Sequence, residues 1–199
     1  MSPASATRPA RERLLSAAAE LFYESGIAAT GVDAVLRRAG VSPATLYAHF
    51  AGKDALVAAY LEQRHHEWRA VWDELLAERT DPRGRLLAVF DAVARYRDRS
   101  GSRRGCGFLA AGTELPAGHP GQRWLTADTS LLVERLGDLA RAAGAVRPVD
   151  LALDLLLLYD GALAGFARNA TTPRSAGDDP LGRARAAAVT LLDTRLVDQ

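Results

Sequence analysis

Residues 43–50 carry the kinds of side chain that let a short helix enter a groove of double-stranded DNA. The first three are small or hydroxylated: Pro43, Ala44 and Thr45. Such a helix can bring its N-terminus close to base edges in a major groove about 12 Å wide. Tyr47 and His49 can form hydrogen bonds with phosphates at the flanks. Leu46 and Phe50 have the spacing of residues that face back into a core.

Cationic residues accompany this segment on both sides. Lys53 lies near the start of the next predicted helix, where its charge and the helix dipole could hold a phosphate. In the N-terminal tail, Arg8, Arg11 and Arg13 against Glu12 give a local charge of +2 that could reach the DNA backbone. On spacing alone, an equally good alternative is that the tyrosine and the histidine of residues 43–50 are ordinary surface and core residues of a helical bundle.

The elements that must position these residues form a helix-turn-helix pattern. One face of a first helix is apolar, with Leu14, Leu15, Ala18, Leu21 and Phe22. It ends at Gly26, which suits a left-handed cap. The hydroxyl of Thr30 is expected to cap a second helix, with Asp33 in its first turn as in a capping box. That helix ends at Gly40, and Ser42 followed by a proline opens the third.

The rest of the chain also has helical periodicity, and no run of alternating β-branched residues indicates a sheet. A long helix is predicted from Lys53 to about Arg79, and at ~1.5 Å per residue it spans roughly 40 Å, enough to leave one bundle and enter another. Further helices are predicted at 83–99, 108–115, 122–143, 149–170 and 181–197, with a disordered loop at 171–180. The predicted fold class is therefore all-α, with about nine helices.

Composition excludes several classes of protein. The chain has 199 residues, of which 48% are hydrophobic, so it can bury a core. A net charge of +1 means that any DNA binding must come from a local site. Its single cysteine, Cys106, fits a reducing cytoplasm. We expect a soluble protein without a targeting segment or membrane span, because charged residues interrupt the apolar runs.

Signatures of enzymes and metal sites are weak. Glu62 and His66 have helical spacing and His65 adjoins them, but no second pair repeats the spacing as a zinc site would require. The sequence has no glycine-rich phosphate loop and no G-x-S-x-G elbow. We therefore predict no enzyme activity, no cofactor and no metal.

The segment from Thr30 to Leu56 resembles the DNA-binding domain of the tetracycline repressor (TetR) family. It reads T-G-V-D-A-V-L-R-R-A-G-V-S-P-A-T-L-Y-A-H-F-A-G-K-D-A-L. The family pattern is close to T-x-V-x-x-I-A-x-x-A-G-V-S-x-x-T-L-Y-x-H-F-x-x-K-x-x-L. The chain departs from it at Val35-Leu36, where Ile-Ala is usual, and at Gly31, where a hydroxyl residue is frequent and could contact a phosphate.

The resemblance implies a division of the chain and a set of DNA contacts. Residues 1–52 would form the DNA-binding domain, joined by the long helix to a ligand-binding and dimerisation domain at residues 53–199. Carried over by position, the residues at or near the bases are Ser42, Ala44, Thr45 and Tyr47. Those that hold phosphates are Tyr47, His49 and Lys53, and Thr30 at the start of the second helix completes the predicted DNA site.

The resemblance also implies a homodimer and an inducer cavity. The predicted helices at 149–170 and 181–197 would form a four-helix interface between two chains. Gly161 and Gly165 would let a partner helix approach, although buried glycines in a monomeric core read the same way. The aromatic residues that the resemblance assigns to a pocket for a lipophilic ligand are Trp68, Trp72, Phe90, Tyr96, Phe108, Trp124 and Tyr159. Each is also compatible with plain core packing.

Two further features lie between the predicted helices. Arginines at 95–104 could select an anionic ligand or form a solvated helix end. The segment 104–116 resembles that of one TetR subgroup, in which a Gly-Cys pair precedes a helix with a glutamate, here Glu114. Cys106 reads as a redox sensor or, more simply, as a small buried residue.

The resulting interpretation is a cytoplasmic transcriptional repressor that a small lipophilic molecule releases from a palindromic operator on double-stranded DNA. Two alternatives stay open. One is a helical small-molecule-binding protein or enzyme that no longer binds DNA. The other is a DNA-binding activator or a ligand-independent organiser.

Overall fold

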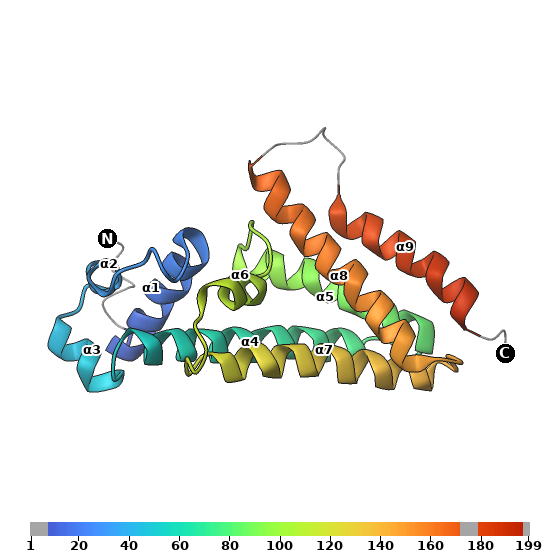
Figure 1. Ribbon diagram of the computed structural model, residues 1–199, viewed down its shortest axis with the longest axis horizontal. Coiled ribbons are helices and arrows are strands. Elements are labelled where there is room, and N and C mark those ends of the chain that lie inside the picture. The colour runs from blue at the N-terminus through green and yellow to red at the C-terminus, as the bar shows by residue number, and fades with distance from the viewer. Residues whose placement is uncertain (1–7, 172–178, 197–199) are drawn as a thin grey trace. The chain divides into compact units, whose positions relative to one another are not determined.

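The computed structural model describes residues 8–171 and 179–196, and within these ranges the chain forms nine α-helices and no strand (Figure 1). One isolated bridge joins Ala145 to Leu196. The predicted all-α fold is confirmed. Most of the loop expected to be disordered, residues 172–178, lies outside the described residues.

The chain divides into two compact units. The first unit contains residues up to 65 together with 107–126, and the second contains 66–106 together with 127 onward. The elements of the first unit are α1 (Ala10–Ser25), α2 (Val32–Ala39), α3 (Pro43–His49), α6 (Gly107–Glu114) and the beginnings of α4 (Lys53–Ala77) and α7 (Gln122–Ala142). The second unit holds the rest of α4 and α7 with α5 (Pro82–Ser100), α8 (Pro148–Thr171) and α9 (Pro180–Arg195). These divisions differ from the predicted domain boundary at 52/53, which stays a prediction.

The helix boundaries follow local signals in the sequence. Every helix predicted after residue 52 begins and ends within two residues of its expected position. Four of them begin one residue early, and three of these, α5, α8 and α9, do so at a proline: Pro82, Pro148 and Pro180. The reason is that proline lacks an N–H and has a fixed φ, which makes it a favoured first helical residue.

In the first unit, α1 packs against α2 and α3. Leu14, Leu46 and Leu56, which come from α1, α3 and α4, are fully buried there. Gly26 ends α1 with a φ of +91° and a ψ of 155°, so it is not the left-handed helical cap that the sequence predicts. Gly40 does adopt that conformation at the end of α2, with a φ of +63° and a ψ of 44°.

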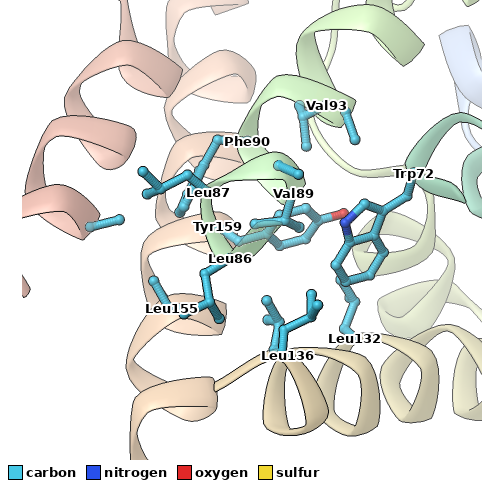
Figure 2. Packing of buried hydrophobic residues seen from close by; sticks show 14 of the residues in the cluster. Trp72, Leu86, Leu87, Val89, Phe90, Val93, Leu132, Leu136, Leu155 and Tyr159 are labelled. Carbon is cyan, nitrogen blue, oxygen red and sulfur yellow. The ribbon is translucent and has the colours of Figure 1, made fainter. Parts of the chain in front are cut away.

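In the second unit, the core is formed by aromatic and aliphatic side chains from five helices. Figure 2 shows Trp72 of α4 and Phe90 of α5 among leucines of α5, α7 and α8. Helices α8 and α9 lie side by side, and α9 also contacts α5 (Figure 1). Small buried residues on α9, Ala184 and Ala188, permit this close packing. Among the described residues, no helix has the length and apolarity to cross a membrane.

Candidate nucleic-acid interface

Helices α2 and α3 form a helix-turn-helix, as the sequence predicts. Only residues 40–42 separate them, and the left-handed Gly40 reverses the chain. The amide of Val41 donates to the carbonyl of Leu36 at 3.2 Å, which closes the last turn of α2. This arrangement satisfies the carbonyl groups at the end of the helix that would otherwise lack donors.

Ser42 is the N-cap of α3, and this prediction is confirmed. Its Oγ accepts a hydrogen bond from the amide of Thr45 at 3.2 Å and lies 2.9 Å from the Thr45 hydroxyl. Pro43 occupies the first turn, where no N–H is needed. Side chains at the start of α3 thus cap the helix locally.

Side chains on α3 divide cleanly between solvent and core. Leu46 and Phe50 are buried, as expected. The side chains that face solvent are those of Ser42, Ala44, Tyr47 and His49, while Thr45 is half-buried. Tyr47 is 63% exposed, which is unusual for a large aromatic residue in a folded domain. Both Tyr47 and His49 lie on the surface, which is compatible with the predicted DNA contact and equally with ordinary surface residues of a helical bundle. Their contact with DNA stays a prediction.

Lys53 is the first residue of α4 and is half-buried. Its Nζ donates to the carbonyl oxygen of Ala28 at 3.5 Å, in the loop between α1 and α2. An ammonium group has three N–H donors, so this bond leaves capacity for a phosphate.

Thr30 does not cap α2, so the predicted capping box is wrong. The N-cap is Gly31, which forms no side-chain cap bond. Thr30 is only 4% exposed, and its hydroxyl donates to the carbonyl of Gly26 at 2.7 Å. The hydroxyl therefore bonds to a carbonyl of the α1–α2 loop instead of capping α2. Its contact with DNA stays a prediction.

The tail arginines contact the domain itself, which sequence reasoning missed. Nη1 of Arg13 donates to the carbonyls of Ala39 and Gly40 at 3.0 and 3.1 Å. Arg11 lies over the ring of Phe50, 5.4 Å from its centre. The orphan carbonyls at the end of α2 were the signal that could have predicted the Arg13 contact. Arg37, exposed on α2 beside the turn, is a further cation absent from the predicted site.

The structure brings together four of the seven aromatic residues predicted to line a pocket. The ring centre of Trp68 lies 5.7 Å from that of Trp72 and 6.0 Å from those of Tyr96 and Tyr159. The indole Nε1 atoms of Trp68 and Trp72 are buried without a hydrogen-bond partner among the described residues. We call Trp68, Trp72, Tyr96 and Tyr159 the aromatic cluster.

Of the other three aromatic residues, Phe90 belongs to the same hydrophobic core of the second unit as the cluster. Phe90 is fully buried among leucines of the second unit (Figure 2). Phe108 and Trp124 belong to the first unit, where Trp124 lies 5.6 Å from the ring of His65. Their role in a pocket stays a prediction.

Two carboxylates on α7 and α8 escaped the sequence analysis. Asp128 is buried, and Asp160 is half-buried. Burial, together with the negative charge of Asp128, raises the pKa of Asp160. The two residues are far apart in the sequence, so no local pattern could pair them.

Comparisons with known proteins agree with this geometry. The family model described as "Bacterial regulatory proteins, tetR family" matches residues 14–60. The crystal structure of SCO4454, a TetR-family transcriptional regulator from Streptomyces coelicolor, has the same fold with a TM-score of 0.81. The two chains are 30% identical, and the alignment covers 94% of this chain and 95% of SCO4454.

Two relatives match over shorter segments. UidR, an HTH-type transcriptional regulator from Escherichia coli, is 41% identical over 56 residues, which are 28% of this chain and 29% of UidR. FasR, an HTH-type transcriptional activator from Mycolicibacterium smegmatis, is 39% identical over 82 residues, which are 41% of this chain and 37% of FasR. The chain thus matches less than two fifths of the length of either relative. The likeness to SCO4454, in contrast, extends along nearly the whole chain, and the protein belongs to the TetR family of transcriptional regulators.

Proposed function

We propose that the protein is a homodimeric repressor that binds a palindromic DNA operator through α3 and is released by a small lipophilic molecule. The observation that carries this proposal is the division of side chains on α3. Small and polar residues face solvent, and Leu46 and Phe50 anchor the helix in the first unit.

The exposed surface of α3 suits a major groove. Its N-terminal side chains are small, so the backbone can approach base edges, and the Ser42 cap holds this end rigid. The exposed ring and hydroxyl of Tyr47 can contact a base edge or a phosphate. Lys53 and His49 supply donors for phosphates on the flanks.

An exposed apolar stripe on α8 supports a dimer. Val149, Leu153 and Leu157 lie one turn apart and are 57%, 50% and 73% exposed. Burying one such side chain contributes about 1.5–3 kcal/mol, so a second copy of α8 is a favourable partner. Two copies related by a two-fold axis can place their α3 helices in successive major grooves about 34 Å apart.

For the glycines of α8 the sequence leaves two alternatives, approach of a partner helix or packing within one chain, and the two glycines differ in this respect. A Cβ added at Gly161 meets no atom within 4 Å, so this glycine faces open space. A Cβ added at Gly165 would lie 2.6 Å from Cβ of Pro180, so Gly165 serves the packing of α8 against α9 within one chain. Gly161 thus lies where a partner helix can approach, one turn beyond Leu157.

The aromatic cluster supports a lipophilic ligand that carries a hydrogen-bond acceptor. Buried N–H groups without acceptors are costly, and an acceptor on a bound molecule would satisfy the indoles of Trp68 and Trp72. Release would follow by linkage. A ligand that favours a dimer whose α3 helices are wrongly spaced for the operator weakens operator binding. The coupling free energy between the two binding events is about 1–3 kcal/mol.

Selection of bound sequences from a random pool of DNA duplexes tests this function. We expect the full chain to enrich inverted repeats, and Tyr47→Ala to bind the enriched duplex about 10- to 100-fold more weakly at an unchanged melting temperature. Arg141→Ala removes an exposed cation in the second unit and is the control that keeps full affinity. A Tyr47→Ala variant with unchanged affinity would exclude α3 as the recognition helix.

Two further measurements separate the alternatives. A carrier or enzyme without DNA binding would show no salt-dependent affinity for random duplex, whereas a DNA-binding dimer must show it. Repeating the selection with lipophilic compounds, monitored by tryptophan fluorescence, tests release. Because FasR is named as an activator, a reporter gene downstream of the enriched site must also decide between repression and activation.

A further inference from the structure

Glu114, the last residue of α6, contacts the loop between α1 and α2. Its Oε2 accepts a hydrogen bond from the amide of Ala28 at 2.6 Å. The contact joins residues 86 positions apart in the sequence. A carboxylate that accepts from a backbone N–H forms a charge-assisted bond, which is about twice as strong as a bond between neutral groups. The carboxylate also lies against Gly26, where an added Cβ would be 3.2 Å from Oε1.

The same residue, Ala28, is bound on its other side by Lys53. Glu114 accepts the N–H of Ala28, and Lys53 donates to its C=O at 3.5 Å. One residue of the loop is therefore held between an anion from α6 and a cation from α4. A shift of the loop would move the atom to which the Lys53 ammonium is bonded.

A second contact reaches the first turn of α4 from the segment after α6. The side chain of His119 is 5% exposed, and its Nε2 lies 3.5 Å from Oδ1 of Asp54. Nδ1 of His119 accepts the amide of Gly121 at 2.9 Å, so in the neutral ring the proton is on Nε2, facing Asp54. Glu114 thus contacts the residue to which Lys53 is bonded, and His119 contacts the residue that follows Lys53.

We propose that Glu114 is a positioning residue for DNA binding, which fixes the α1–α2 loop and thereby the ammonium group of Lys53 for a phosphate. This inference rests on the proposed function. It gives a residue of α6 a role in DNA binding although that residue need not touch DNA. His119 supports the same end of α4 by its contact with Asp54.

Amide hydrogen exchange in the full chain tests the contact without DNA. In Glu114→Ala the Ala28 amide loses its acceptor, and we expect its exchange to become about tenfold faster or more. Glu114→Gln keeps one oxygen acceptor but no charge, so its Ala28 amide should exchange at a rate between those of the wild type and Glu114→Ala. The control is Glu134→Ala, which removes an exposed glutamate of α7 in the second unit. Unchanged exchange at Ala28 in Glu114→Ala would overturn the proposal.

Affinity for a duplex enriched by the wild-type chain tests the positioning role. We expect Glu114→Ala to bind about 3- to 30-fold more weakly, because a charge-assisted bond no longer holds the loop. Like Lys53→Ala, it should also lower the slope of log affinity against log salt by about 0.9, the value of one phosphate contact. A purely structural defect would not change this slope.

A double-mutant cycle distinguishes the possible failures. If Glu114 acts through Lys53, then Glu114→Ala adds little to Lys53→Ala, and the two effects are not additive. Fast exchange at Ala28 with unchanged affinity, or fully additive effects, would overturn the positioning role. Should Glu114→Ala fail to fold, the salt slope and exchange of Glu114→Gln decide in its place. A wild-type chain that enriches no duplex would instead reject the proposed function, and this inference with it.

Discussion

Helices α3 and α8 both expose side chains to solvent, but the chemistry of the two surfaces is opposite. On α3 the exposed residues are small or polar, with a single large ring at Tyr47. On α8 the exposed large side chains in the N-terminal half are the aliphatic Val149, Leu153 and Leu157. A polar surface with small side chains suits a hydrated, charged partner, because the backbone can approach it closely. An aliphatic stripe suits another aliphatic surface, because water is excluded between the two. This contrast matches the proposed function, in which α3 binds DNA and α8 binds a second copy of the chain.

Leu157→Asp tests the α8 side of this comparison and has the largest expected effect. At 73% exposure in one chain, the aspartate is harmless in a monomer, but it would be buried as an unpaired charge in the dimer. We expect the dimer to dissociate at least 100-fold more readily and operator binding to be lost, because a charge costs several kcal/mol to bury. Sedimentation equilibrium measures the dissociation constant.

The control for that variant is Leu109→Asp, on α6 of the first unit, where the leucine is 49% exposed. It introduces the same charge in place of an exposed leucine and should leave the dimer intact. A Leu157→Asp chain that stays dimeric would show that α8 is not the interface.

Gly165→Ala and Gly161→Ala sharpen the comparison within α8 itself. The methyl group at 165 would clash with Pro180 of α9, so we expect the free energy of unfolding to fall by about 1–3 kcal/mol. At 161 the methyl meets open space, and the better helix propensity of alanine should leave the fold unchanged or more stable by up to about 1 kcal/mol. Urea unfolding at one protein concentration measures both. Equal losses for the two variants would contradict the assignment of Gly161 to an open face.

The sequence predicts elements well where one short segment contains the whole signal. The Ser42 cap, the glycine turn at residue 40 and the start of α3 at Pro43 depend on residues that are neighbours in the chain. The division of α3 into exposed and buried residues follows from helical spacing in the same way. These features needed no knowledge of tertiary contacts.

Sequence reasoning fails where a side chain has more than one possible partner. The Thr30 hydroxyl had a plausible local role as a cap, but it bonds to the carbonyl of Gly26 instead. Arg13 was expected to reach the DNA backbone, but its guanidinium donates to the carbonyl of Ala39 at the end of α2. In both cases the side chain donates to a backbone carbonyl that the sequence pattern did not indicate.

Membership of a unit could not be predicted for residues 107–126. They follow α5 in the chain, yet they pack in the first unit, where Glu114 bonds to Ala28. No spacing rule links two residues so far apart. The same limit hid the proximity of Asp128 and Asp160.

Ser42→Ala and Ser42→Asp separate stability from recognition on α3. Alanine removes the cap, which costs about 1 kcal/mol and lowers the melting temperature by about 2–4 °C. Aspartate keeps the cap, so the melting temperature should stay near that of the wild type, while its charge repels phosphate and weakens operator binding about tenfold or more. Calorimetry and fluorescence anisotropy measure the two properties. If Ser42→Asp binds the operator as tightly as the wild type does, the start of α3 does not face the duplex.

Asp160→Asn has the smallest expected effect, and it concerns a charge that the fold partly buries. Burial, and then the charge of Asp128, raises the pKa of Asp160 above its ordinary 3.8. The unfolded chain therefore loses this proton at a lower pH than the folded chain does. Stability is lost as the pH rises from 3.8 through the raised pKa, and the penalty is complete above it.

The amide in Asp160→Asn carries no charge and avoids this penalty. We expect a melting temperature about 2 °C higher at pH 7, and no difference below pH 3.8, where both states of the wild type are protonated. Asp98→Asn, exposed on α5, is the control that should change nothing at either pH. A gain that persists at acidic pH would attribute the stabilisation to packing of the amide rather than to the removed charge.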